Sequence, residues 1–392
     1  MKPIFTTFLV VLLSYFAQAQ TRILFDATKA EMANNADWII DADQHNIMGN
    51  ESNPQRFPTP AQSGITANTP EYYWKGALSA WAVDCVKEGY IVETLPVSGQ
   101  ITYGTTNLQD LSNYDIFVVC EPNIKFTWSE KTALMNFVQN GGGLFMISDH
   151  DNSDRNGDGW DSPAIWNDFM ESNSIQNNPF GIEFDYEFFT EATFNIPNLS
   201  DDPLLNGNYG NVTTVEFYGG TSMTLHPNQN TSVKGVVFRP GANNTGNYES
   251  LCAYATYGEG KVVALGDSSP PDDGSGDIHD NLYDGWLEDA NGNHERLIMN
   301  ATIWLAQKEV VASQNPSINE NGLQLFPNPT HSLLHIKTDM DVNEVVVINS
   351  LGQRVISKPF RSSLNVENLP KGLYYLYVLG RDGMLSGSFE VF

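Results

Sequence analysis

A strand–helix–strand segment between residues 115 and 150 constrains the fold of this chain more than any other stretch. Two short apolar runs, 115–120 and 141–147, flank a segment at 129–139 that carries apolar residues at helical spacing. Continuous apolar runs of this length are typical of parallel strands that are buried on both faces. The order predicts a right-handed βαβ unit, with Ser129 as the N-cap of its helix.

The same alternation of strand-like and helix-like segments continues on both sides of this unit. Further strands are expected at 22–26, 90–95, 233–238, 251–255 and 261–267, and helices at 29–40, 77–88, 164–172 and 294–307. Residues 180–224 mix aromatic residues, Asn and Gly, and are expected to form an irregular insertion with some strand. Strands that alternate with helices predict an α/β fold with a doubly wound, mostly parallel sheet.

The two ends of the chain differ from this central domain, which we place at residues 20–308. Residues 1–19 have a positive start, an apolar stretch and a small-residue cleavage site, and so predict a signal peptide. A polar linker at 309–322 leads to residues 323–392, where short alternating strands predict a small antiparallel β-sandwich. No cysteine follows the cleavage site, and no later apolar run is long enough to span a bilayer.

Charge and cysteine content exclude several kinds of partner and site. The formal net charge is -27, from 47 acidic and 20 basic residues, which argues against nucleic acid or an anionic membrane as a partner. The three cysteines, Cys85, Cys120 and Cys252, are too few and too irregularly spaced for a disulfide framework or a zinc site. We expect Cys85 and Cys120 to pack in the core.

Three segments of the tail carry a resemblance to a known family. They are 325–330 (LFPNPT), 345–353 (VVVINSLGQ) and 369–376 (LPKGLYYL). With them, the tail resembles the type A C-terminal sorting domain of the type IX secretion system of Gram-negative bacteria. The resemblance implies handling by that secretion machinery, export across the outer membrane, removal of the tail, and either release or attachment to the cell surface. Residues 386–392 depart from the family because they lack its Lys-rich finish.

The central domain resembles another family through the runs 115–120 and 141–147 and the segment 258–267 (GEGKVVALGD). These are similar to the class I glutamine amidotransferase-like superfamily, in its diverged trehalose-utilisation-like branch, and imply an amidotransferase-like or flavodoxin-like sheet. True amidotransferases carry a cysteine nucleophile and a His-x-Glu motif after two of these strands. Ser148 and the segment 267–269 (DSS) stand there instead, so glutaminase chemistry is not supported.

The ends of the two strands at 141–147 and 261–267 predict the functional site, since ligands bind at the carboxyl ends of strands in open α/β sheets. Ser148, Asp149 and His150 are consecutive, so they point in different directions and cannot form a triad among themselves. A serine nucleophile would need His279 or Asp267 as its partner.

A divalent metal site is the favoured interpretation of the same strand ends. Mixed Asp and His ligands with an open position suit a hydrolytic metal, whereas oxygen ligands alone suit Ca²⁺. The candidate ligands are Asp26, Asp149, His150, Asp151, Asp267 and Asp273, with Asp272, Asp277, His279 and Asp280 in the second acidic loop. The alternative is that these acids cap helices and bind loop backbone.

The loop after His150 also matches the start of a Ca²⁺-binding loop. Asp154, Asn156 and Asp158 supply oxygens at alternate positions, and a glycine stands at the sharp turn. The twelfth position is Ile165 rather than Glu, so the loop is not an EF-hand, and Asp161 or Asp168 would have to complete the ligand shell. An ordinary Asx-turn loop is the competing interpretation.

Aromatic residues beside these loops could stack on sugar rings, although core packing explains them equally well. They are Tyr72, Tyr73, Trp74, Trp160, Trp166 and Trp286, while His45, His226 and His294 are expected at the surface or at helix caps.

The leading hypothesis is a secreted, metal-dependent hydrolase-like protein with carbohydrate as its candidate substrate. The alternatives are a non-catalytic, Ca²⁺-stabilised carbohydrate- or surface-binding module, and a purely structural domain.

Overall fold

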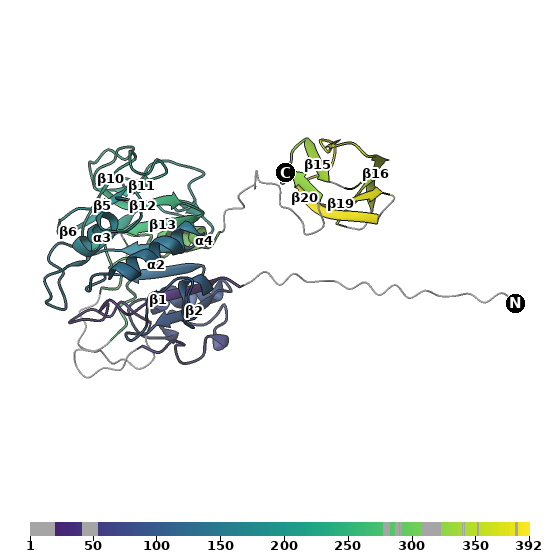
Figure 1. The fold of residues 1–392 in the computed structure, drawn as a ribbon. Coiled ribbons are helices and arrows are strands. Elements are labelled where there is room, and N and C mark those ends of the chain that lie inside the picture. The colour runs from purple at the N-terminus through teal and green to yellow at the C-terminus, as the bar shows by residue number, and fades with distance from the viewer. Residues whose placement is uncertain are drawn as a thin grey trace. The chain divides into compact units, whose positions relative to one another are not determined.

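A computed structural model describes residues 20–40, 54–276, 283–286, 290, 292–307, 323–338, 340, 342–350, 353–380 and 383–392. The chain divides into two compact units, Met1–Lys308 and Glu309–Phe392 (Figure 1). The predicted signal peptide, the predicted linker, His45, Asp277, His279 and Asp280 lie outside the described residues.

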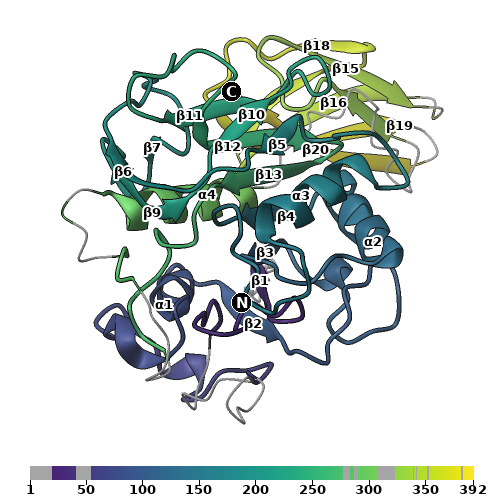
Figure 2. The same cartoon turned by 90° about the vertical axis from the view of Figure 1, so that its left-hand side faces the viewer.

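A nine-stranded sheet forms the centre of the first unit (Figure 2). Five neighbouring strands are parallel, in the order β2 (Ile91–Leu95), β1 (Arg22–Asp26), β3 (Ile116–Cys120), β4 (Gly143–Ile147) and β13 (Gly260–Leu265). Antiparallel strands continue the sheet as β12 (Ser250–Tyr257), β10 (Met223–Leu225) and β5 (Ile182–Phe184), with β11 (Lys234–Phe238) also paired to β12. The predicted α/β fold class is confirmed.

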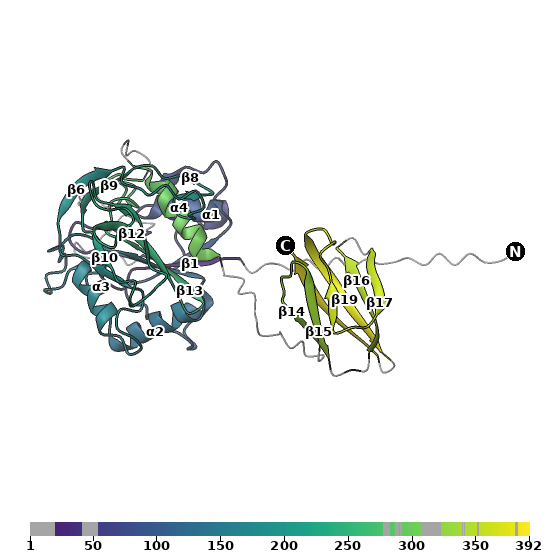
Figure 3. The same cartoon turned by 90° about the horizontal axis from the view of Figure 1, so that it is seen from above.

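Helices cover both faces of this sheet, as the doubly wound prediction requires (Figure 3). The helices α1 (Ser79–Lys87) and α4 (His294–Ala306) share one hydrophobic core, whereas α2 (Trp128–Gln139) and α3 (Ser162–Glu171) share the other. Successive side chains of β1 point to opposite faces of the sheet, so Phe25 lies in the first core and Leu24 in the second.

Two local predictions are wrong. The helix expected at 29–40 is absent, and that stretch forms turns with Ala30 and Asn34 in left-handed conformations. The amide of Lys29 binds the Glu31 carboxylate at 2.8 Å, and the amides of Ala33 and Ala36 bind carbonyls three residues back, as in turns. The N-cap of α2 is Thr127 rather than Ser129, because Thr127 and Glu130 form a reciprocal capping box.

The insertion after α3 contains short strands, as predicted. They are β6 (Phe189–Thr193) paired with β9 (Val215–Gly220), and β7 (Asn206–Gly207) paired with β8 (Gly210–Asn211). Three 3₁₀ turns complete the unit: η2 (Gln62–Gly64), η3 (Glu71–Tyr73) and η4 (Leu111–Asn113). The three cysteines are unpaired and buried, which confirms the core packing predicted for Cys85 and Cys120. Within the described residues, no helix is long and apolar enough to cross a membrane.

The second unit consists of two antiparallel sheets that share one hydrophobic core. One sheet has the order β14 (Leu323–Phe326), β15 (Leu333–Thr338) and β18 (Ser363–Asn365). The other has the order β17 (Arg354–Pro359), β16 (Val342–Asn349), β19 (Gly372–Gly380) and β20 (Gly383–Val391). Alternating residues such as Val345 and Val347 face the core, which is the pattern that predicted a sandwich.

Candidate functional site

The parallel register brings three strand ends to one level. Cys120 on β3 pairs with Ile147 on β4, and Ile147 pairs with Leu265 on β13. Glu121 follows β3 directly, while Asp149 and Asp267 each stand two residues beyond the ends of β4 and β13. Three carboxyl groups therefore meet at the carboxyl edge of the sheet, where the sequence placed the site.

These three residues, Glu121, Asp149 and Asp267, form what we call the acid cluster. Their exposures are 0%, 2% and 0%, respectively. Arg155 partly neutralises the cluster, because its guanidinium pairs with Glu121 and donates to Asp149 Oδ2 at 2.9 Å. Ser268 donates to Glu121 Oε2 at 3.0 Å. Buried carboxylates that have a cation and hydroxyl donors as partners avoid much of the cost of desolvation.

Burial changes the acidity of two members of the cluster. Burial raises the pKa of Asp267 to about 7, although this carboxylate accepts backbone amides from Ser269 at 2.8 Å and from Tyr218 at 2.6 Å. Burial, and then the negative charge of Glu121, hold the pKa of Asp149 well above its usual range. The proton of Asp267 thus binds and leaves near neutral pH, and Asp149 keeps its proton to higher pH than an exposed aspartate does.

Glu121 has an unusual backbone conformation for its residue type. Its φ is 47°, in the left-handed region that costs a non-glycine residue about 1 kcal/mol or more. Its amide donates to the carbonyl of Ile147 at 3.0 Å, and its carbonyl accepts the side chain of Asn123 at 2.8 Å. These bonds hold the turn that aims the carboxylate at Arg155.

His150 connects the acid cluster to the surface. Its Nδ1 lies 2.7 Å from the carbonyl oxygen of Asp151, so Nδ1 carries a proton, and Nε2 lies 3.7 Å from Asp149 Oδ2. The side chain is 23% exposed, and the Phe188 ring packs edge-on against it at a centroid distance of 4.3 Å. His150 is thus a member of the predicted site that a ligand could reach.

Ser148 is buried and faces away from a base. Its hydroxyl donates to the neighbouring carbonyl of Asp149 at 3.3 Å. Among the described residues, no histidine or carboxylate accepts a hydrogen bond from it. The serine-nucleophile interpretation therefore gains no support from the described part of the chain, and its other proposed partner, His279, lies outside that part.

The remaining predicted ligands have protein partners of their own. Asp26 lies beside Lys29 and Glu31, and burial raises its pKa to about 6. Asp273 caps α1 by accepting the amide of Ala80 at 2.7 Å. Asp151 accepts the side-chain amide of Asn152 at 2.7 Å. The alternative interpretation, in which acids cap helices and bind loop backbone, describes these contacts.

The loop at 154–158 binds its own backbone. Asp154 accepts the amides of Gly157 and Gly159, and Asp158 accepts that of Trp160. The side chain of Asn156 accepts the amide of Asp158 and donates to the Asn123 carbonyl. Asp161 caps α3, and Asp168 pairs with Lys125 and Lys131.

The described residues do not offer a ready-made metal site. They contain no group of three or more His, Cys, Asp or Glu side chains arranged to hold an ion. Asp149 is paired with Arg155, and both oxygens of Asp267 accept backbone amides. The divalent metal, including Ca²⁺, stays a prediction from the sequence.

The predicted aromatic residues divide by burial. Trp74, Trp166 and Trp286 are buried, whereas Tyr72 and Trp160 are exposed. Beside His150, the structure adds the exposed side chain of Phe188, which was not predicted for this role. The exposed Tyr218, whose backbone amide binds Asp267, stacks on Tyr283 at 4.3 Å. These rings give the edge of the sheet an aromatic surface.

Two of the predicted histidines have structural contacts. His294 is buried at the start of α4, where Nδ1 lies 2.6 Å from the Gly285 carbonyl oxygen and Nε2 accepts the Glu216 amide. His226 is half-buried and lies 2.7 Å from Glu183. Neither histidine contributes to the acid cluster.

Sequence reasoning missed Glu121 and Arg155. Glu121 could have been predicted, because it directly follows a buried strand. Asp149 and Asp267, which were predicted, stand two residues after the ends of their strands. Arg155 is the single Lys or Arg in the acidic stretch 149–161, and this isolated positive charge was the only feature of the sequence that could have indicated its role.

Comparison with known proteins identifies the tail. Residues 324–386 match the family model described as "Secretion system C-terminal sorting domain". The second unit is a type IX sorting domain. The predicted resemblance is confirmed there, and it implies secretion or export to the cell surface, with handling by the type IX machinery. A comparison with curated proteins found no match.

Solved structures resemble the first unit weakly. The N-terminal domain of mmIFT52 is 13% identical, with a TM-score of 0.42 over 74% of this chain and 99% of that one. A cytoplasmic protein of Salmonella typhimurium is 14% identical, with a TM-score of 0.38 over 72% and 98%. A putative thua-like protein of Parabacteroides merdae is 12% identical, with a TM-score of 0.35 over 76% and 93%. Similarity at this level carries no argument about activity.

Proposed function

We propose that residues 20–308 form the hydrolase-like domain of a secreted protein, and that this domain acts on carbohydrate at the carboxyl edge of its sheet. The observation that carries this proposal is the pairing of the accessible His150 with Asp149, in front of the buried acid cluster. An imidazole at the surface with a protonatable carboxyl group 3.7 Å from its Nε2 is suited to general acid–base chemistry.

The role of His150 follows from its hydrogen bonds. Because Nδ1 donates to the Asp151 carbonyl, the neutral ring has an unprotonated Nε2 that can accept a proton from a water molecule. The water oxygen then attacks the substrate carbon, and the proton passes to the leaving oxygen, so that one water is added across the broken bond. The exposed Phe188 gives a sugar ring an aromatic surface beside the imidazole.

Replacing His150 with Gln is expected to lower the hydrolysis rate of the glycan substrate by about 100-fold or more, the usual contribution of a general base. Asp149→Asn should lower it as well. The measurement is the release of reducing ends from a panel of polysaccharides, with circular dichroism to confirm folding. His226→Gln is the matched control, since His226 pairs with Glu183 outside the site. A His150→Gln variant with the rate of the unmodified protein would contradict the proposal.

A second candidate is a non-catalytic carbohydrate-binding module that Ca²⁺ stabilises. The burial of the acid cluster favours it, because fully buried carboxylates cannot touch a substrate without an opening of the site. This candidate predicts that the protein binds glycan without turnover, and that EDTA lowers its melting temperature. Elemental analysis of the same preparations tests every predicted metal. A melting temperature unchanged by EDTA, with no bound calcium, would contradict the prediction that Ca²⁺ stabilises this protein.

A further inference from the structure

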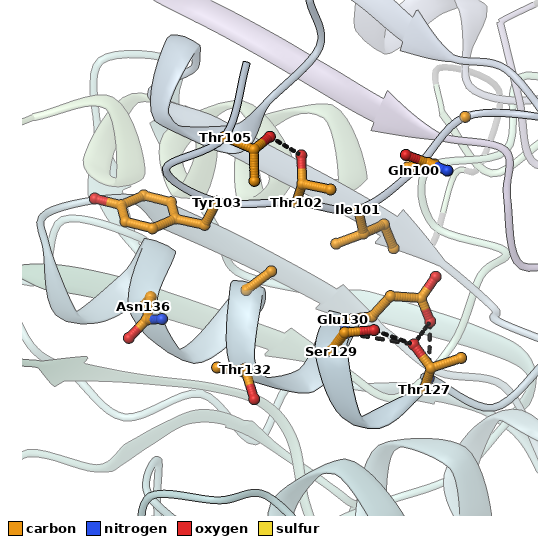
Figure 4. A pocket seen from close by; sticks show the side chains of 12 residues that line it. Gln100, Ile101, Thr102, Tyr103, Thr105, Thr127, Ser129, Glu130, Thr132 and Asn136 are labelled. Atoms are coloured by element: carbon orange, nitrogen blue, oxygen red, sulfur yellow. Dashed lines mark hydrogen bonds between the residues drawn. The ribbon is translucent and has the colours of Figure 1, made fainter. Parts of the chain in front are cut away.

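A cavity of about 430 Å³ lies between α2 and the loop 99–105 (Figure 4). Its volume falls within the range of roughly 300–1,000 Å³ that is typical of small-molecule sites. None of its lining residues belongs to the acid cluster or contacts His150 in the bonds described above. We propose that this cavity binds a neutral carbohydrate, at a site separate from the strand ends.

The chemistry of the walls selects a neutral, hydroxyl-rich ligand. The lining contains threonine and serine hydroxyls, two side-chain amides, one tyrosine and small apolar groups, and it contains no Lys, Arg or His. Its one charged residue, Glu130, is already occupied, because it pairs with Lys29 at 2.7 Å and accepts the amide of Thr127 at 2.7 Å. An anionic ligand would find no cation there, and a cationic ligand would find no unpaired carboxylate.

Three polar side chains of the lining are available to a ligand. Among the described residues, the side chains of Gln100, Tyr103 and Asn136 have no hydrogen-bond partner within the protein. Figure 4 shows Gln100 and Tyr103 on the loop, with Asn136 on the helix below them. Amide and phenol groups both donate and accept hydrogen bonds, which matches the hydroxyl groups of a sugar. The Tyr103 ring, partly packed on the core, adds an aromatic face for the sugar ring.

Asp110 holds the loop wall in place before any ligand arrives. Its buried carboxylate accepts the hydroxyl of Thr102 at 2.8 Å, the amide of Gly104 at 2.8 Å, and both the amide and the hydroxyl of Thr105. The opposite wall is fixed by the capping box of α2. Binding to preformed walls avoids most of the cost of ordering them, so weak contacts suffice for measurable affinity.

The experiment measures binding of neutral gluco-, manno- and galacto-oligosaccharides to the full chain by calorimetry, with an oligogalacturonide as the acidic comparison. We expect Tyr103→Ala to weaken binding of the preferred neutral oligosaccharide at least tenfold and Asn136→Ala at least threefold. The acidic oligosaccharide should not bind this cavity. The matched controls are Tyr248→Ala and Gln139→Ala, which replace exposed residues outside the lining and should leave affinity unchanged.

The outcomes separate this site from the strand-end site. Binding that is weakened in Tyr103→Ala and kept in His150→Gln supports a separate cavity, whether or not the protein hydrolyses any glycan. Binding that is lost in His150→Gln but kept in Tyr103→Ala would overturn the inference, as would a protein that binds none of the neutral panel. Asp110→Asn should also weaken binding, since it loosens the loop without removing a lining group.

Discussion

Replacing Arg155 with methionine is expected to lower the free energy of unfolding of the first unit by about 3–5 kcal/mol. The reason is that Arg155 is the cation of the acid cluster, where it pairs with Glu121 and with Asp149. Removing it leaves two fully buried carboxyl groups without their counter-charge, and methionine fills much of the space without restoring it. Urea unfolding, followed by tryptophan fluorescence, measures the loss.

Arg239→Met is the matched control for this prediction. Arg239 also pairs with carboxylates, those of Glu187, Glu191 and Glu249, but these partners are partly exposed, so the expected loss is about 1 kcal/mol or less. The double variant Arg155→Met with Glu121→Gln should recover part of the stability, because it removes one of the unpaired charges. Equal losses from Arg155→Met and Arg239→Met would show that the cluster does not depend on its guanidinium.

The strands of the first unit were predictable because their signal is local. The run at 22–26 gave β1 with its correct bounds, and the run at 141–147 gave β4, since buried parallel strands are continuously apolar. The helix expected at 29–40 failed because the same apolar spacing also fits a series of turns, in which the first amide, that of Lys29, binds the buried carboxylate of Glu31. The spacing of apolar residues does not show whether a backbone amide will bind a side-chain acceptor or a helical carbonyl.

The candidate site was predictable only in part. Asp149 and Asp267 were found because each follows a buried strand, and the parallel register then brings them together. Arg155 could not be found that way, since its contact with Glu121 joins a loop to a different strand end. The role of Asp273 as a helix cap likewise depends on which helix lies in front of it, and only the tertiary fold decides that. Asp161 differs, because it directly precedes its own helix α3 and is a local N-cap.

Raising the pH from 5 to 8 is expected to destabilise the first unit, and Asp267→Asn should remove a large part of that effect. In the unfolded chain Asp267 loses its proton near pH 4, whereas burial raises its pKa to about 7 in the folded state. Its stabilising proton is therefore fully present below pH 4 and lost as the pH rises through 7, with an upper limit on the order of 4 kcal/mol. Asp26 and Asp273, each with a pKa of about 6, act in the same direction.

Melting temperatures at several pH values between 5 and 8 measure this slope. Asp267→Asn should be less stable than the unmodified protein at pH 5. Both oxygens of Asp267 accept backbone amides, so the side-chain NH₂ of Asn would face the N–H donor of Ser269 or Tyr218 and leave that donor unpaired. Its slope with pH should nevertheless be shallower. Asp110→Asn is the control: burial raises the pKa of Asp110, but hydrogen bonds from Ser112 and Thr105 outweigh it and leave a lowered pKa, so Asp110 stays ionised throughout this range. That variant should keep the original slope, and an unchanged slope in Asp267→Asn would place the titrating proton elsewhere in the unit.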